Sequence, residues 1–286
     1  MKPSDIPVVI LCGGQGTRLR EETEFKPKPM VTVGDRPILW HLMKYYSHFG
    51  FNRFILCLGY RGDYIKEYFY NYETMNSDFT IDLAKKRVQF HSSHPEQWEV
   101  TLADTGLEAM TGARIKRIER YVQAERFCLT YGDGLSNVDL HKLLAFHESH
   151  GKLATMTAVH PPSRFGTMEF EGERITSFAE KPNMGEGFIN GGFFVCERGV
   201  FDYLERDDAC IFERAPLERL AQDDQLLAYR HGDFWQCMDT IRDAKLLNDL
   251  WASGESPWRI WGDRQPIEIE SKIPAALPPV PAGDRQ

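Results

Sequence analysis

Residues 8–19 are the stretch that says most about the fold of this chain, and it reads Val8-Val9-Ile10-Leu11-Cys12-Gly13-Gly14-Gln15-Gly16-Thr17-Arg18-Leu19. Its first part is a continuous run of β-branched and aliphatic residues, which predicts a strand buried on both faces, as in a parallel sheet. Three glycines follow, so the strand enters a loop whose backbone N–H groups can approach an anion closely. Arg18 adds a planar donor with a permanent positive charge. The stretch therefore predicts a phosphate-binding loop at the end of a buried strand.

Two common phosphate-binding motifs do not fit this loop. The dinucleotide fingerprint requires a third glycine where Leu19 stands, and the P-loop requires Gly-Lys followed by Ser or Thr. On these residues alone, a plain glycine-rich turn without a ligand remains the alternative.

The segments that follow the loop alternate between helix and strand patterns. A helix is predicted after Pro37, and a second buried strand over 54–58 leads to a helix that starts at Asp63 and reaches residue 72. This order predicts a parallel sheet with helices on its faces and right-handed crossovers. The predicted elements further along are strands at 88–91, 127–131, 155–159, 167–170, 175–180 and 193–196, and helices from Thr111 through Val122 and at 139–150, 216–222 and 240–251.

Composition limits the classes of partner. The 286 residues are 42% hydrophobic and 27% charged, which is typical of a globular protein with a full core. The formal net charge of −8 disfavours sequence-independent binding to nucleic acid or to an anionic membrane. Neither an apolar run of membrane-spanning length nor a signal-peptide pattern is present, so we predict a cytoplasmic protein.

The six cysteines are far apart in the sequence, without a CxxC pair or a histidine at metal-ligand spacing. Most of them stand in apolar runs, so buried free thiols are predicted rather than zinc ligands or disulfides. The six are Cys12, Cys57, Cys128, Cys196, Cys210 and Cys237.

A second basic motif, Lys26-Pro27-Lys28-Pro29-Met30, follows the glycine loop. Its two prolines hold the backbone extended and present a lysine toward the loop. Alone, this motif predicts only a solvated basic turn. Combined with G-G-x-G-T-R, it resembles the signature of the sugar-1-phosphate nucleotidyltransferases, in which Lys28 matches the family lysine.

Further motifs of that family follow in the same order, and the resemblance extends from Val8 to about Trp261. Tyr131-Gly132-Asp133-Gly134 resembles the segment with a metal-binding Asp, and Glu180-Lys181-Pro182 resembles the sugar-phosphate-binding motif. Asn190-Gly191-Gly192 resembles the sugar-binding turn, and Trp235-Gln236-Cys237-Met238-Asp239-Thr240 resembles the segment with the second metal-binding Asp. Each motif alone would indicate only a turn.

Within the family the chain is most similar to the glucose-1-phosphate cytidylyltransferases. The similarity lies in Ile38-Leu39-Trp40-His41, in the segment 98–106 with its Asp104-Thr105-Gly106, and in Met110-Thr111-Gly112. It implies transfer of a cytidylyl group from CTP to α-D-glucose 1-phosphate, giving CDP-glucose for surface polysaccharide (O-antigen) synthesis. A UTP- or dTTP-dependent enzyme and a catalytically silent regulatory relative remain alternatives. Cys12 departs from the Ala that many relatives carry, with no expected effect on the chemistry.

The resemblance also implies the architecture. We expect an α/β fold with a Rossmann-like, mixed but mainly parallel sheet flanked by helices, and a small β-hairpin sugar-binding part. Residues 1–262 would form one domain, with a nucleotide-binding part at about 6–160 and a sugar-binding part at about 161–262. Residues 263–286, which are rich in proline, would be a mobile tail. A homo-oligomer is expected.

The site residues carried over from the family fall into three groups. Arg18, Lys28, Asp133 and Asp239 would be catalytic, and the two aspartates would hold Mg²⁺. Glu180, Lys181, Asn190 and Gly191 would bind the sugar phosphate. The nucleotide would contact Leu11, Cys12, Gly13, Gly14, Gln15, Gly16, Thr17, Arg18, Lys28, Thr111, Arg114 and Gly132.

Two of the expected contacts have structural alternatives. Arg114 stands in the first turn of a predicted helix, where it could meet the triphosphate or the base, and the alternative is a surface arginine. Asp104 and Thr105 could recognise the edge of a cytosine, and the alternative is a plain turn.

Overall fold

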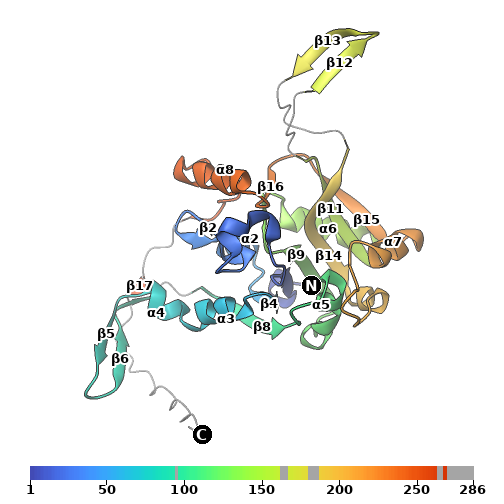
Figure 1. Cartoon of the computed structure of the whole chain (residues 1–286). Helices are drawn as coiled ribbons and strands as arrows, with labels where there is room; N and C mark the ends of the chain where they lie inside the picture. Colours follow the sequence, from blue (N-terminus) through green and yellow to red (C-terminus); the bar gives the residue numbers. More distant parts are fainter. Residues whose placement is uncertain (94–95, 162–166, 180–186, 263–266, 269–286) are drawn as a thin grey trace. The chain divides into compact units, whose positions relative to one another are not determined.

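A seven-stranded sheet is the central feature of the computed structural model (Figure 1). The structure describes residues 1–93, 96–161, 167–179, 187–262 and 267–268. The strands run in the order β15-β11-β14-β9-β1-β4-β8. Their bounds are β1 (Val8–Leu11), β4 (Arg53–Leu58), β8 (Glu99–Asp104), β9 (Arg126–Tyr131), β11 (Ala154–Val159), β14 (Ile189–Glu197) and β15 (Leu226–His231).

The strand directions make this sheet mixed but mainly parallel, which confirms the predicted fold class. β1 is parallel to both β4 and β9, and β8 is parallel to β4. β14 is antiparallel to β9 and to β11, and β15 is parallel to β11. Leu11 pairs with Tyr131, so β1 and β9 end side by side. The loops that follow these two strands therefore leave the sheet at the same edge, where open α/β sheets bind ligands.

Helices complete the α/β pattern. The α-helices are α1 (Arg20–Thr23), α2 (Ile38–His48), α3 (Gly62–Tyr70), α4 (Tyr72–Asn76), α5 (Thr111–Arg117), α6 (Leu140–His150), α7 (Ala215–Gln222) and α8 (Ile241–Ala252). Short 3-10 helices are η1 (Pro3–Asp5), η2 (Thr17–Leu19), η3 (Lys28–Met30), η4 (Glu119–Tyr121) and η5 (Arg198–Tyr203).

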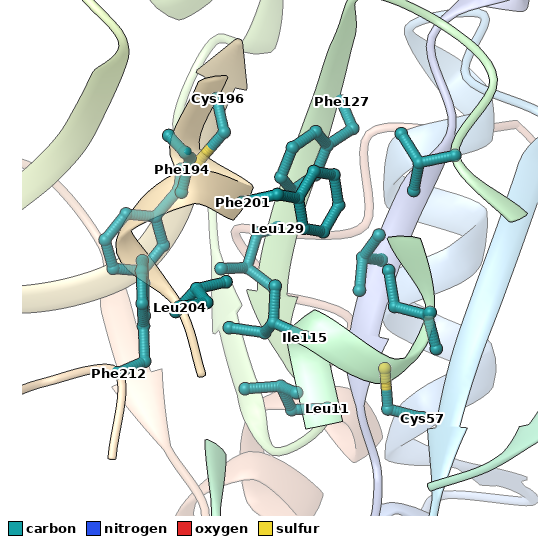
Figure 2. Close-up of a cluster of buried hydrophobic side chains, with 14 of the residues drawn as sticks. Leu11, Cys57, Ile115, Phe127, Leu129, Phe194, Cys196, Phe201, Leu204 and Phe212 are labelled. Carbon is teal, nitrogen blue, oxygen red and sulfur yellow. The ribbon is translucent and has the colours of Figure 1, made fainter. Parts of the chain in front are cut away.

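Both faces of the central strands are covered. Figure 2 shows one face, where Leu129 of β9 and Phe194 of β14 pack with Ile115 of α5 and with Phe201 and Phe212. Phe193, which precedes Phe194 in β14, points to the opposite face. There it stacks on Tyr46 of α2, with 6.1 Å between ring centroids. Because successive side chains of a strand point to opposite faces, the continuous apolar runs of β1 and β9 follow from this double cover.

Among the described residues, five two-stranded pairs lie outside the main sheet. They are β2 (Thr32–Val33) with β3 (Arg36–Pro37), β5 (Phe79–Asp82) with β6 (Arg87–Phe90), β7 (Ser92–Ser93) with β17 (Ile267–Glu268), β10 (Gly134–Ser136) with β16 (Trp235–Cys237), and β12 (Thr167–Glu171) with β13 (Arg174–Ala179). The β12–β13 pair is the predicted hairpin, and Gly172 in its turn has φ of +61°.

The chain forms two compact units, 1–65 with 98–261, and 66–97 with 262–286. The first contains the main sheet, and the second contains the β5–β6 hairpin and the β7–β17 pair. The predicted tail, 263–286, lies outside the described residues except for Ile267–Glu268, which form β17. The functional division at about residue 160 stays a prediction.

Several predictions of local structure were wrong or incomplete. The helix expected from Asp63 to residue 72 breaks at Asn71, where α3 has ended and α4 begins. α5 ends at Arg117, and the buried Val122 follows a 3-10 turn instead of the same helix. β8 and β15 were not predicted, because they are the edge strands of the sheet and lack a continuous buried run.

The prediction for the cysteines is confirmed. All six are free thiols, and Cys12, Cys57, Cys128 and Cys196 are buried. No helix among the described residues is long and apolar enough to cross a membrane.

Candidate active site

A cleft of about 370 Å³ opens where β1 and β9 end, within the size range of small-molecule sites. It lies in the larger unit, and its walls combine the glycine loop, the start of α5 and the turn after β9. The lining residues are Leu11, Cys12, Gly13, Gly14, Gly16, Thr17, Arg18, Lys28, Pro29, Ala109, Met110, Thr111, Arg114, Tyr131, Gly132 and Asp133. Most of the predicted nucleotide-binding residues thus share one cleft.

The three glycines of the loop meet different demands. Gly16 has φ of +63°, a backbone conformation that side chains with a Cβ disfavour. A Cβ on Gly13 would lie 2.3 Å from the guanidinium carbon of Arg114. A Cβ on Gly14 would meet no described atom within 4 Å. Gly14 is therefore the position where the backbone is open for a ligand to approach.

Hydrogen bonds fix the loop to its surroundings. The Thr23 hydroxyl, at the end of α1, donates to the carbonyl oxygens of Gly16 and Leu19, both at 3.0 Å. The backbone N–H of Tyr60 donates to the Gly13 carbonyl at 3.1 Å. The loop is held from both sides, so its shape exists before any ligand binds.

Four predicted catalytic residues meet in what we call the ion-pair cluster: Arg18, Lys28, Asp133 and Asp239. Lys28 Nζ lies 2.6 Å from Asp133 Oδ2 and 2.5 Å from Asp239 Oδ1. Arg18 Nη1 lies 2.8 Å from Asp239 Oδ2. Because Asp133 Oδ2 and Asp239 Oδ1 contact the same Lys28 nitrogen, the two aspartate oxygens lie close to each other.

A short ribbon brings the two aspartates together. β10 follows Asp133 directly and pairs with β16, with Gly134 opposite Cys237. The backbone N–H of Met238 then donates to the Asp133 carbonyl at 2.8 Å. Asp239 follows Met238, so a two-strand pairing across about a hundred positions of sequence aligns the carboxylates.

The start of α8 holds Asp239 from the other side. Asp243 accepts hydrogen bonds from the backbone N–H groups of Asp239 and Thr240 at 3.2 and 2.9 Å. Thr240 in turn caps the helix, so the two side chains form a capping box. The backbone of Asp239 is fixed by this arrangement while its carboxylate stays free to face Lys28.

The opposite charges of the cluster shift the pKa of Lys28 and that of Asp239 in opposite directions. Burial alone would lower the pKa of Lys28, but the charges and hydrogen bonds of Asp133 and Asp239 outweigh it and raise the pKa. Burial alone would raise the pKa of Asp239, but Lys28 and Arg18 outweigh it and lower the pKa. Both groups are therefore charged at neutral pH.

Arg114 is buried behind the glycine loop, so the alternative of a surface arginine is wrong. Its side chain is 5% exposed, and Nη2 donates to the carbonyl oxygen of Gly13 at 3.1 Å. Further hydrogen bonds go to carbonyl oxygens of Leu58, Gly106 and Leu107 and to the Thr105 hydroxyl. The guanidinium thus ties the glycine loop to the loop after β8. A direct contact with nucleotide stays a prediction.

Asn190-Gly191-Gly192, predicted as a sugar-binding turn, is instead part of strand β14 and lies beside Tyr131. Asn190 donates to the Tyr131 hydroxyl at 3.2 Å, and the Gly191 carbonyl accepts from the Trp235 indole at 2.6 Å. A Cβ on Gly191 would lie 2.7 Å from the Thr157 hydroxyl oxygen, so only glycine fits there. Glu180 and Lys181 lie outside the described residues.

Glu213 was missed by the sequence analysis. Its carboxylate accepts from the Thr111 hydroxyl at 2.6 Å and from the Tyr131 hydroxyl at 2.5 Å. Burial and this carboxylate raise the pKa of Tyr131. Glu213 thus links the start of α5 to the end of β9. It follows Phe212 in a stretch without a recognisable motif, so the sequence held no signal for it.

Three other positions predicted to contact or recognise the nucleotide do not line the cleft formed by the described residues: Gln15, Thr105 and Asp104. Gln15 is exposed and does not line the cleft among the described residues. Thr105 is 1% exposed, and its hydroxyl donates to the Leu58 carbonyl at 2.6 Å, so the side chain is engaged inside the protein. Asp104 is exposed and accepts from the backbone N–H of Gly106.

Comparisons with known proteins identify a family for this chain. Residues 7–240 match the family model described as nucleotidyl transferase. The chain is 50% identical over 254 residues to the glucose-1-phosphate cytidylyltransferase of Salmonella typhi, which covers 88% of this chain and 98% of that protein. It is 44% identical over 253 residues to the "Probable glucose-1-phosphate cytidylyltransferase" of Bacillus subtilis, covering 88% of this chain and 99% of that protein.

A similar solved structure is that of HddC from Yersinia pseudotuberculosis, described as complexed with GMP-PN. Its TM-score is 0.61 at 25% sequence identity, and the match covers 86% of this chain and 99% of that chain.

Proposed function

This chain belongs to the nucleotidyl transferase family, and we propose that it transfers the cytidylyl group of CTP to α-D-glucose 1-phosphate, giving CDP-glucose and pyrophosphate. The ion-pair cluster beside the open glycine loop carries the proposal. The 50% identity to a glucose-1-phosphate cytidylyltransferase over most of both chains supports the choice of substrates.

The chemical problem of this reaction is charge. An oxygen of the sugar phosphate attacks the α-phosphorus of the triphosphate, and pyrophosphate leaves on the opposite side. Both reactants are anions, and the chain itself has a net charge of −8. The sugar phosphate is already a nucleophile, so no covalent enzyme intermediate is needed. Catalysis can rest on orientation and on positive charge placed where negative charge develops.

The residues of the cleft fit these tasks. The backbone N–H groups of the glycine loop and the Arg18 guanidinium would hold the β- and γ-phosphates and stabilise the leaving pyrophosphate. Lys28 would carry its charge to the α-phosphate or to the incoming sugar phosphate. Asn190 and Gly191, next to the cleft residue Tyr131, would contact the sugar. Lys181, which is outside the described residues, would steady the sugar phosphate. Arg114 supports the loop from behind through the Gly13 carbonyl.

The two aspartates suit a magnesium ion. Carboxylate oxygens are the ligands Mg²⁺ prefers, and it is usually held by one or two of them together with substrate phosphates. Among the described residues no group of three or more His, Cys, Asp or Glu gathers as a complete cage. Asp133 and Asp239 would hold the ion, which when bound would neutralise charge on the reacting phosphate oxygens. The capping box at α8 would keep Asp239 oriented.

The test is a comparison of nucleoside triphosphates. Purified protein is incubated with Mg²⁺, glucose 1-phosphate and CTP, UTP or dTTP in separate reactions. Pyrophosphate release is followed, and the product is identified by mass spectrometry. We expect release with CTP and a product with the mass of CDP-glucose. Faster release with UTP or dTTP would assign a different base. Binding of CTP without release under any condition would indicate a silent relative.

A further inference from the structure

The ion-pair cluster leaves the candidate metal ligands in contact with cations of the chain itself. Asp239 meets Lys28 through one carboxylate oxygen and Arg18 through the other, and Asp133 meets Lys28 through Oδ2. Two negative charges are thus balanced by two positive charges. A divalent ion that bound the same oxygens would face both cations at close range.

Lys28 is the cation held more firmly. Its side chain is 12% exposed and contacts both carboxylates, whereas that of Arg18 is 75% exposed and contacts one. Lys28 lies between Pro27 and Pro29 at the start of the 3-10 turn η3, and the backbone N–H of Val31 donates to the Lys28 carbonyl at 3.1 Å. Since proline restricts the backbone on both sides of Lys28, we expect the lysine to leave both carboxylates by a movement of its side chain and not of its backbone.

We propose that Lys28 is the resident cation of the Asp133–Asp239 pair before substrate binds, and that a divalent metal ion has to displace its ammonium group to reach these carboxylates. This inference rests on the proposed function, because it takes the two aspartates as the metal ligands. A triphosphate offers Lys28 new anionic partners, so the metal ion and the nucleotide are expected to enter together. Lys28 then has two successive positions, first on the carboxylates and afterwards on phosphate.

The experiment measures Mn²⁺ binding to the full-length chain without substrates, using the electron paramagnetic resonance signal of the free ion. Lys28→Met removes the ammonium charge while keeping a long side chain. An ammonium this close lowers the affinity of a carboxylate for a proton by an order of magnitude or more, so removing it should raise the Mn²⁺ affinity at least about tenfold. Lys28→Arg retains a cation and should bind Mn²⁺ as weakly as the wild type.

A matched control lies two residues away. Lys26 Nζ pairs with Glu22 at 3.2 Å, away from Asp133 and Asp239. Lys26→Met removes the same charge from the same loop and should leave Mn²⁺ affinity unchanged. Lys28→Gln provides a second neutral variant, and circular dichroism of each variant confirms that it is folded.

Two results would overturn the proposal. Lys28→Met and Lys28→Gln could be folded and bind Mn²⁺ no more tightly than the wild type. Alternatively, the gain could persist when Asp239→Asn is added to Lys28→Met, which would place the ion elsewhere. Either result would leave the proposed function standing if the wild type still makes CDP-glucose. Absence of that product would instead refute the proposed function.

Discussion

Gly13 and Gly14 are adjacent, yet a Cβ would meet different surroundings at each. At Gly13 the space for a Cβ is filled by the Arg114 side chain, whereas at Gly14 that space is open to the cleft. A substitution at Gly13 would therefore disturb the buried arginine, and one at Gly14 would obstruct the ligand. Substitutions at these two adjacent positions should therefore have different effects: one on the packing that supports the loop, the other on the space open to a ligand.

Arg18 is the residue whose chemistry can be tested most simply. Arg18→Lys keeps the charge but loses the planar two-pronged donor, and the loss of one such contact to developing charge should cost about 3 kcal/mol, or about a hundredfold in kcat. Arg18→Ala should be slower still, with little change in affinity for glucose 1-phosphate. Steady-state kinetics with both substrates varied provides the measurement.

Arg61→Lys serves as the control, because Arg61 donates to the Phe25 carbonyl and does not line the cleft. If Arg18→Ala instead turned over CTP normally and failed only in binding the sugar phosphate, the two substrates would lie in the opposite orientation.

Which site residues could be predicted depended on whether they stand in a motif. Lys28, Asp133 and Asp239 each stand in a short recognisable pattern, and the structure places all three within contact distance. Glu213 contacts Thr111 and Tyr131 only because the chain returns to the cleft before α7. A contact made by folding alone leaves no local pattern.

At the scale of elements, the β10–β16 ribbon and the start of α8 form the support of the two aspartates. The ribbon sets the separation of Asp133 and Asp239, and the capping box fixes the backbone after β16. The motifs around both aspartates could be read in the sequence. Their pairing could not, because three-residue strands are too short to show an alternating pattern. Strands β1, β4 and β9 were predicted well because both of their faces are buried.

Asp243 tests this support. Asp243 Oδ2 accepts from the N–H groups of both Asp239 and Thr240, and Oδ1 accepts from the Gln236 side-chain amide at 3.1 Å. Asp243→Asn turns one of these two oxygens into an NH2 donor, so at least one of the donors loses its acceptor. We expect a loss of about 1–2 kcal/mol in the free energy of unfolding, measured in urea. A fall in kcat should accompany it, because Asp239 loses its fixed backbone.

The control is Asp249→Asn on the same helix, which breaks an exposed pair with Lys245 and should change stability by only a few tenths of a kcal/mol. Equal effects of the two substitutions would show that the capping box has no special role.

At the scale of the whole molecule, helix α2 and the carboxyl-terminal part of the larger unit are joined through an aromatic cluster around His41. The His41 ring, in α2, packs edge-on against Trp251 with 4.6 Å between centroids. Its Nε2 lies 2.8 Å from the Val33 carbonyl oxygen, and Trp258 contacts its other nitrogen. Trp251 and Trp258 thus contact the buried His41 ring although both are far from it in the sequence. No local sequence pattern predicts these contacts.

This imidazole should make stability fall in mild acid. Burial lowers the pKa of His41 from 6.5 to about 4, so below pH 6.5 the unfolded chain binds a proton that the folded chain does not. His41 in its neutral form therefore contributes about 3 kcal/mol to the free energy of unfolding above pH 6.5. This contribution is lost progressively as the pH falls to about 4. Urea unfolding from pH 7 to 4 measures it.

His41→Gln should flatten that part of the pH profile, whereas His48→Gln, an exposed position at the end of the same helix, should not. A profile of His41→Gln parallel to that of the wild type would contradict the assignment.

The most direct test of the central claim is the rate of CDP-glucose formation in Asp133→Asn and Asp239→Asn at saturating Mg²⁺, with Asp249→Asn measured alongside. If the ion-pair cluster is the catalytic centre, both substitutions should reduce kcat more than about a hundredfold, because a neutral amide is a poor ligand for Mg²⁺. Circular dichroism should show that both variants remain folded, and Asp249→Asn should match the wild type. Turnover near the wild-type rate in either variant would remove that aspartate from the catalytic centre and contradict the account.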